Sequence, residues 1–207
     1  YVPTHTRKGG IPGVKMKDIR GMLELMETNA ADTGVRLFGW HDENQGILHV
    51  VPPEQGITQP GFFICGADSH TSTHGAFGNI AFGVGSSEAA HIMATQCLWQ
   101  QRPKTFRINV EGDLPFGVHS KDIILGVIAD IGVGGGVGHA IEFAGSCIEG
   151  LTMEQRMTVC NMTIEAAGRM GLIAPDETTY EYMDERPYMP KGALLQEALA
   201  YWKSLPS

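Results

Sequence analysis

The sequence predicts an α/β fold with a largely parallel sheet. Short apolar segments that resemble strands alternate along the chain with segments of helical periodicity, and the connections between them are short and rich in glycine. Glycine accounts for 27 of the 207 residues, roughly twice the usual share of ~7%. Tight loops with close backbone approach are therefore expected in many places.

The first sixty residues are predicted to form a loop, one helix and two short strands. Residues 5–15 are typical of a loop, and residues 15–30 carry apolar side chains at helical spacing, closed by a Thr-Gly pair. Residues 35–40 and 46–51 are predicted as short strands. Two consecutive prolines stop the second of these.

The next segment contains a strand over residues 61–65, then a cluster of polar residues and a glycine-rich passage. A helix is predicted over residues 86–100. Ser86 or Ser87 can cap it, and Glu88 lies in its favourable first turn. Its apolar face would consist of Ala90, Met93, Ala94 and Cys97.

Strands and helices continue to alternate in the second half. The predicted elements are a half-buried strand over residues 105–112, a buried helix over 121–132 capped by Ser120, a strand within 134–145, a helix over 153–171 capped by Thr152, and a last helix over 192–204. No internal repeat or linker divides the chain, so residues 1–207 read as one continuous piece of an α/β protein.

Charge and composition exclude several classes of partner. The formal net charge is −8 and the 15 Lys and Arg residues are scattered, so neither a nucleic-acid surface nor a basic membrane patch is expected. No apolar stretch reaches the roughly 18 residues of a membrane-spanning helix. The four cysteines contain no C-x-x-C pair, and buried thiols in a reducing cytoplasm are predicted.

The segment FFICGADSHTSTHG places Asp68, Ser69, His70 and His74 directly after a strand. The carboxyl ends of strands in an α/β sheet face the ligand crevice, which makes these residues candidates for a functional site. Two chemistries fit. Asp68, His70 and His74 could be ligands of a divalent metal, as in a metal-dependent hydrolase.

Alternatively, histidines oriented by carboxylates could act as general acids toward a leaving hydroxyl. This reading requires further partners, and His49 and Glu142, each inside an apolar segment, are the candidates. Each of these residues could also be structural: an Asp after a strand is often a turn former or cap, and a buried His is often a packing residue.

Other motifs in the sequence give weaker support for a functional site. The glycine loops match neither a P-loop nor a dinucleotide-binding fingerprint, although the helix beginning at Ser86 offers N–H groups to an anion. Cys160 has no local base and is predicted to pack rather than to act as a nucleophile. Asn161 and Glu165, four residues apart, are predicted to hold a neighbouring loop.

Taken together, three segments resemble the aconitase superfamily: GADSHTSTHGAFGNIAFGVGSSEAAHIMATQ, GHAIEFAG and MTVCNMTIEA. The segments QGILHVVPPEQGITQPG and GLIAPDETTYEYM are most similar to the large subunits of the isopropylmalate isomerases. Homoaconitases and 2,3-dimethylmalate dehydratases share the same blocks. The resemblance implies aconitase-like α/β/α domains.

The resemblance also implies a reaction. The family removes water from a small hydroxy-diacid or triacid and adds it back across the same double bond, using a [4Fe–4S] cluster held by three cysteines. By this resemblance His49 would pair with Asp68 and His70 with Glu142, while Ser69 would face the substrate and cluster. A separate small subunit would be the partner of the complete enzyme.

The chain departs from the family pattern in the residues that bind the cluster. The family's Ser-Cys-Thr-Asn and C-x-x-C stretches do not occur, and neither does the Asp-His pair that precedes a segment like YVPT. We therefore expect this chain to be roughly the first two domains of a longer subunit. By itself, the chain is expected to hold no cluster and to have no dehydratase activity. A non-catalytic assembly module is the alternative from a different class.

Overall fold

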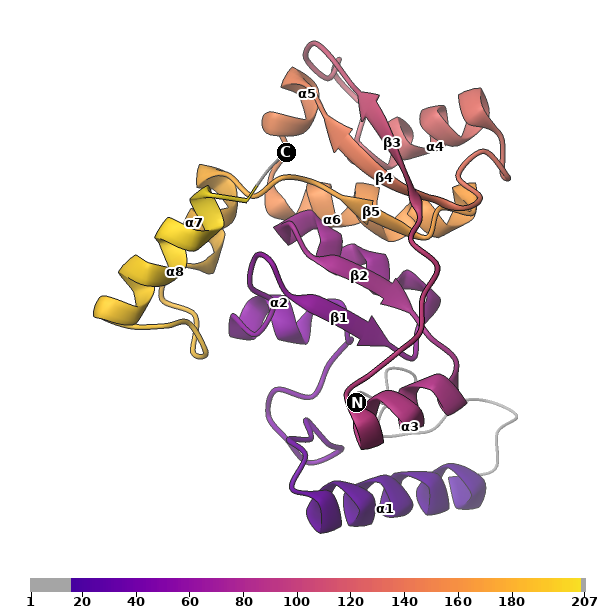
Figure 1. Ribbon diagram of the computed structural model, residues 1–207, viewed down its shortest axis with the longest axis vertical. Coiled ribbons are helices and arrows are strands. Elements are labelled where there is room, and N and C mark those ends of the chain that lie inside the picture. Colours follow the sequence, from indigo (N-terminus) through magenta and orange to yellow (C-terminus); the bar gives the residue numbers. More distant parts are fainter. Residues whose placement is uncertain (1–15, 206–207) are drawn as a thin grey trace. The chain divides into compact units, whose positions relative to one another are not determined.

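In the computed structural model the described residues are 16–205, with side chains described from Ile19 onward, and they belong to two compact units divided after Glu54 (Figure 1). The predicted loop over residues 5–15 lies outside the described residues. In the described chain, no helix is both long enough and apolar enough to cross a membrane.

The first unit contains α1 (Met16–Thr33), which ends as predicted at Gly34 with a positive φ of 68°. The two strands predicted after it are wrong, because the described residues there form turns and irregular chain. The carbonyl of Ile47, for example, accepts hydrogen bonds from the N–H groups of both Val50 and Val51.

The prolines that were expected to stop a strand instead lie in the first turn of α2 (Val51–Gln55). Proline is tolerated there because the first N–H groups of a helix have no intrahelical partner to lose. A short apolar segment is therefore not enough to make a strand when no neighbouring strand pairs with its backbone.

The second unit contains two parallel sheets, as the sequence predicts for an α/β fold. In the first, β1 (Phe63–Gly66) pairs with β2 (Ile80–Gly83). In the second, β4 (His139–Ala144) lies between β3 (Lys104–Asn109) and β5 (Met170–Leu172). The chain passes from β2 through α3 (Ser86–Thr95) to β3, as Figure 1 shows.

Helices occupy the connections of the second unit. Besides α3 they are α4 (Ser120–Ile131), α5 (Ser146–Glu149), α6 (Met153–Asn161), α7 (Glu177–Met183), α8 (Ala193–Lys203) and the 3₁₀ helices η1 (Ser69–Phe77) and η2 (Met162–Ala166). The core combines side chains from η1, α4, β4 and α6, chiefly Phe77, Ile124, Ile141, Phe143, Val159 and Cys160.

The predicted caps are correct for one helix and wrong for two. Thr152 caps α6 as expected, but Gly85 and His119 are the N-caps of α3 and α4. In both helices an acidic residue three positions later accepts a hydrogen bond from the N-cap N–H. The carboxylate thus satisfies an N–H group at the start of the helix. Ser86 and Ser120 are therefore the first helical residues and not the N-caps.

Two other predictions are corrected. The helix expected over residues 153–171 ends at Asn161, continues as η2, and stops at Ala167, whose φ is 58°. Only Ser120 and Ile124 of α4 are buried, and no residue of α3 is buried. Apolar periodicity identified these two helices, but it did not predict that most of their apolar side chains stay accessible to solvent.

Candidate functional site

Asp68 lies between the carboxyl ends of β1 and β2 and is the N-cap of η1. Its Oδ1 accepts a hydrogen bond of 2.7 Å from the N–H of His70, and its carbonyl accepts one of 2.7 Å from the Thr71 hydroxyl. A Cβ at Gly83 would lie 2.6 Å from the Asp68 carbonyl oxygen. The end of β2 therefore approaches Asp68 closely because residue 83 is glycine.

The polar residues after Asp68 hold η1 against the end of α6. Ser72 donates to the Cys160 carbonyl at 2.6 Å, and the Asn161 amide donates to the Thr73 hydroxyl at 2.8 Å. Asn161 thus holds a neighbouring segment, but that segment is the 3₁₀ helix η1 and not the loop that was predicted.

His74 is buried, with 1% of its surface exposed, and its Nδ1 lies 2.9 Å from the Thr58 hydroxyl. A buried histidine with a hydroxyl partner is typical of a packing residue. Within residues 19–205, no group of three or more His, Cys, Asp and Glu side chains is arranged to hold a metal ion. The geometry of Asp68, His70 and His74 therefore gives no support to the metal-hydrolase alternative.

His70 is half-buried and contacts the last residue of α6 and η2. Its Nδ1 lies 3.0 Å from the carbonyl oxygen of Asn161. Because a carbonyl can only accept, Nδ1 carries the proton and donates it, and this fixes the tautomer. Nε2 is thereby left to exchange protons, and it lies 3.8 Å from Oε1 of Glu165.

Glu142 lies in the middle of β4, opposite Arg107 on β3, and its Oε2 is 3.6 Å from Arg107 Nη1. It lines an apolar pocket of about 890 Å³, whereas Asp68 and Ser69 line another pocket of about 760 Å³. Among the described residues, no hydrogen bond or ion pair joins His70 to Glu142. The pairing of these two residues stays a prediction.

His49 belongs to the turn before α2, in the first unit, and Asp68 belongs to the second. Their pairing also stays a prediction. Sequence reasoning did not assign Glu165 as a neighbour of His70. The helical spacing of Asn161 and Glu165, which placed both residues on one face, was the pattern that could have identified Glu165 as this neighbour.

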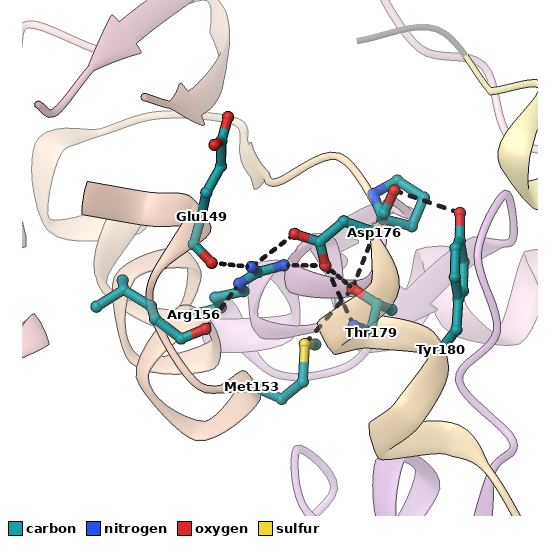
Figure 2. A network of polar contacts seen from close by, with 8 residues as sticks. Glu149, Met153, Arg156, Asp176, Thr179 and Tyr180 are labelled. Atoms are coloured by element: carbon teal, nitrogen blue, oxygen red, sulfur yellow. Dashed lines mark hydrogen bonds and ion pairs between the residues drawn. The ribbon is translucent and has the colours of Figure 1, made fainter. Parts of the chain in front are cut away.

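Sequence reasoning also missed Arg156, whose side chain is fully buried. Figure 2 shows its guanidinium between Asp176, at the start of α7, and the carbonyl of Glu149, at the end of α5. Both nitrogens at its tip lie 2.7 Å from the Asp176 carboxylate oxygens. Burial opposes ionisation of Asp176, but the hydrogen bonds and positive charge of Arg156, together with the hydrogen bonds from Thr179, outweigh it and lower the pKa of the carboxyl.

The four cysteines are free and lie on separate segments: Cys65 in β1, Cys97 after α3, Cys147 in α5 and Cys160 in α6. The prediction of buried thiols is correct for Cys147 and Cys160, but Cys65 is only partly buried and Cys97 is exposed, because no residue of α3 is covered. Burial raises the pKa of the Cys65, Cys147 and Cys160 thiols. A [4Fe–4S] cluster is held by cysteine thiolates that converge on it. Within residues 19–205 no three of these cysteines are grouped together, and the raised pKa of three of the thiols disfavours the thiolate that a cluster would need.

Comparisons of this chain with known protein families and with individual proteins point to the same family. The sequence profile of the aconitase family (aconitate hydratase) matches residues 12–207. The chain is 56% identical over 198 residues to the 3-isopropylmalate dehydratase large subunit of Roseiflexus castenholzii, which covers 96% of this chain and 42% of that protein.

A second relative is the 3-isopropylmalate dehydratase large subunit of Anaeromyxobacter dehalogenans. It is 55% identical over 185 residues, covering 89% of this chain and 38% of that protein. The chain thus spans about two-fifths of the length of these two relatives.

Proposed function

This chain belongs to the aconitase family, and from that premise we propose that it is part of the large subunit of an isopropylmalate isomerase. Such an enzyme is a hydro-lyase that interconverts 2-isopropylmalate and 3-isopropylmalate by dehydration and rehydration in leucine biosynthesis. The observation that carries the proposal is the identity of 56% with a 3-isopropylmalate dehydratase large subunit across 96% of the chain. The position of Asp68 and Ser69 after the end of a strand, in the lining of a pocket, supports it.

We propose two proton-transfer pairs, His49 with Asp68 and His70 with Glu142. The hydrogen bond from His70 Nδ1 to the Asn161 carbonyl supports Nε2 as the atom that gives a proton to the departing hydroxyl. Oε1 of Glu165 lies 3.8 Å from Nε2, so a carboxylate faces the atom at which the transferred proton would be held. Ser69 would face the substrate from the lining of the same pocket as Asp68.

The aconitase family uses a [4Fe–4S] cluster, which supplies a Lewis acid for the hydroxyl of the substrate. We propose that the complete enzyme carries it on cysteines other than the four of this chain, whose dispersed positions support this division. A small subunit is the proposed partner, as the words "large subunit" in the names of the relatives indicate. The free cysteines support a cytoplasmic location.

The test is an anaerobic assay of the intact enzyme with its small subunit, following the ultraviolet absorbance of the unsaturated intermediate. Asp68→Asn should lower kcat by about 10²-fold or more, because the charge of an acid–base partner is lost. Asparagine caps helices as well as aspartate does, so the N-cap of η1 should remain. Folding should therefore be unaffected.

Asp130→Asn is the matched control, since it removes the same charge from an exposed position on α4. Unchanged turnover in Asp68→Asn would remove Asp68 from the mechanism while leaving the reaction in place. An intact enzyme that turns over homocitrate or 2,3-dimethylmalate, but not isopropylmalate, would overturn the proposed substrate.

A further inference from the structure

The pocket beside Asp68 has a second wall that the proposed proton transfers do not use. One side consists of Asp68, Ser69 and Gly83, at the carboxyl ends of β1 and β2. The other side includes Lys104 and His139, at the amino ends of β3 and β4. Its volume of about 760 Å³ is within the range of roughly 300–1,000 Å³ typical of small-molecule sites.

Three cationic side chains, Arg102, Lys104 and Arg169, line this pocket, and Asp68 is its one acidic lining residue. In the described part of the chain none of the three cations forms an ion pair. The chain as a whole carries a net charge of −8, so this excess of positive charge is a local feature. Positive charge gathered in a cleft attracts small anions.

Arg169 is held in place by neutral partners. Its Nη2 donates to Gln100 Oε1 at 2.7 Å, and its guanidinium carbon lies 4.3 Å from the centre of the Phe82 ring. Stacking on an aromatic ring and one hydrogen bond orient the planar group without neutralising it. Among the described residues, its other N–H groups form no hydrogen bond, and they can pair with a carboxylate in the two-pronged geometry that arginine favours.

We propose that this pocket binds the carboxylates of a small diacid, with Arg169 as the principal ligand and Lys104 and Arg102 beside it. The inference rests on the proposed function, because a hydroxy-diacid is the substrate class of that reaction. It assigns to this chain the residues that hold the substrate's carboxylates next to Asp68 and Ser69. A single arginine with two flanking cations suits a dianion better than a monocarboxylate.

The test is calorimetric titration of the full chain with 2-isopropylmalate and with succinate at low ionic strength. Arg169→Gln should raise Kd for both diacids about ten- to hundredfold, as expected for losing charge-assisted hydrogen bonds. Lys104→Gln and Arg102→Gln should each raise Kd by a smaller factor, because both residues are exposed. Lys121→Gln, which removes one positive charge from an exposed position on α4 outside the pocket, should leave Kd unchanged.

Wild-type chain that binds neither diacid, or Arg169→Gln and Lys104→Gln chains that bind as tightly as wild type, would overturn the inference. If Arg169→Gln does not fold, the exposed Lys104→Gln and Arg102→Gln variants carry the test. In the intact enzyme Arg169→Gln should raise KM more than it lowers kcat. Diacid binding that depends on Arg169 in an enzyme without isomerase activity would keep the pocket and refute the proposed reaction. An Arg169→Gln enzyme that keeps isomerase activity with an unchanged KM would support the proposed reaction and refute the diacid site.

Discussion

At the scale of the residue, Arg156 decides the geometry of three segments at once. Its guanidinium donates to the carbonyls of Leu151 and Glu149 and to both oxygens of Asp176, so the loop between α5 and α6 is joined to the start of α7 (Figure 2). Asp176 in turn caps α7 by accepting from the N–H of Thr179. A buried charge is tolerated here because nearly every one of its donors has an acceptor.

We predict that Arg156→Met lowers the free energy of unfolding by about 3 kcal/mol, the lower end of the cost of breaking a buried ion pair. The lower end applies because the Asp176 side chain is 38% exposed and its charge is partly screened. Urea denaturation at neutral pH measures this change. Lys203→Gln, which breaks the exposed pair with Glu177, should cost less than about 1 kcal/mol. Equal losses in the two variants would show that the burial of Arg156 contributes nothing.

The pH dependence of the same pair has a definite sign. Because the folded-state pKa of Asp176 is lowered, its contribution to stability is fully present above the unfolded value near ~4. It is lost as the pH falls through the lower pKa of the folded state. The stability difference between wild type and Asp176→Asn should therefore be largest at neutral pH and shrink below about pH 4. A difference that grows on acidification would contradict this assignment.

At the scale of the element, η1 and β5 pack so closely that only glycine fits between them. A Cβ at Gly75 would overlap the carbonyl oxygen of Gly171, and the Gly75 carbonyl accepts from the N–H of Ile173 at 3.0 Å. The contact is between two backbones, so no flexible side chain can move aside. The position of η1, and with it Asp68 and His70, therefore depends on this residue.

We predict that Gly75→Ala destabilises the protein by at least about 2 kcal/mol, in the range of overpacked cores. Gly126→Ala is the matched control: it adds the same methyl group inside α4, where nothing beyond the neighbouring backbone of the helix lies within 4 Å of the added Cβ. That substitution should stabilise the protein by up to about 1 kcal/mol, because alanine is the better helix former. Thermal unfolding of both variants separates steric overlap from helix propensity. A Gly75→Ala variant as stable as wild type would disprove the close packing of η1 on β5.

The helix ends show why element boundaries were harder to predict than the elements. Apolar spacing continues through residues 153–171, yet the helix stops at Asn161 because the Asn161 carbonyl accepts from His70 and its amide donates to Thr73. Those partners are 88 or more residues away in the sequence. A local pattern cannot contain them.

At the scale of the whole molecule, the two units are unequal. All members of the hydrophobic core cluster, from Ala76 to Trp202, belong to the second unit, and so do both parallel sheets. The described part of the first unit contributes α1, a stretch of turns and most of α2. The second unit therefore contains the requirements for independent folding within its own residues.

We predict that a chain beginning at Gln55 folds on its own, because it retains the whole core cluster. It should unfold in one cooperative transition, with a Tm within about 8 °C of the full chain, which corresponds to a loss of no more than a few kcal/mol. Calorimetry and near-ultraviolet circular dichroism measure this directly. A broad, non-cooperative transition would show that the first unit is needed to complete the core.

The sequence by itself determined the fold class, the order of most elements of the second unit and the segment that carries the candidate site. These follow from local chemistry: apolar periodicity, the capping preference of Thr152 and the cluster of Asp68, Ser69 and His70 after an apolar run. The family blocks are also local in sequence, and the profile that matches residues 12–207 agrees with them.

The tertiary structure alone decided which residues meet. It brought Glu165 to His70, placed Arg107 beside Glu142, buried His74 against Thr58, and gathered Arg102, Lys104 and Arg169 around Asp68. It also left the expected strands at residues 35–40 and 46–51 unformed. The physical reason is the same in each case. Pairing of charges, backbones and buried polar groups depends on distances between segments far apart in the chain, which no local pattern of residues contains.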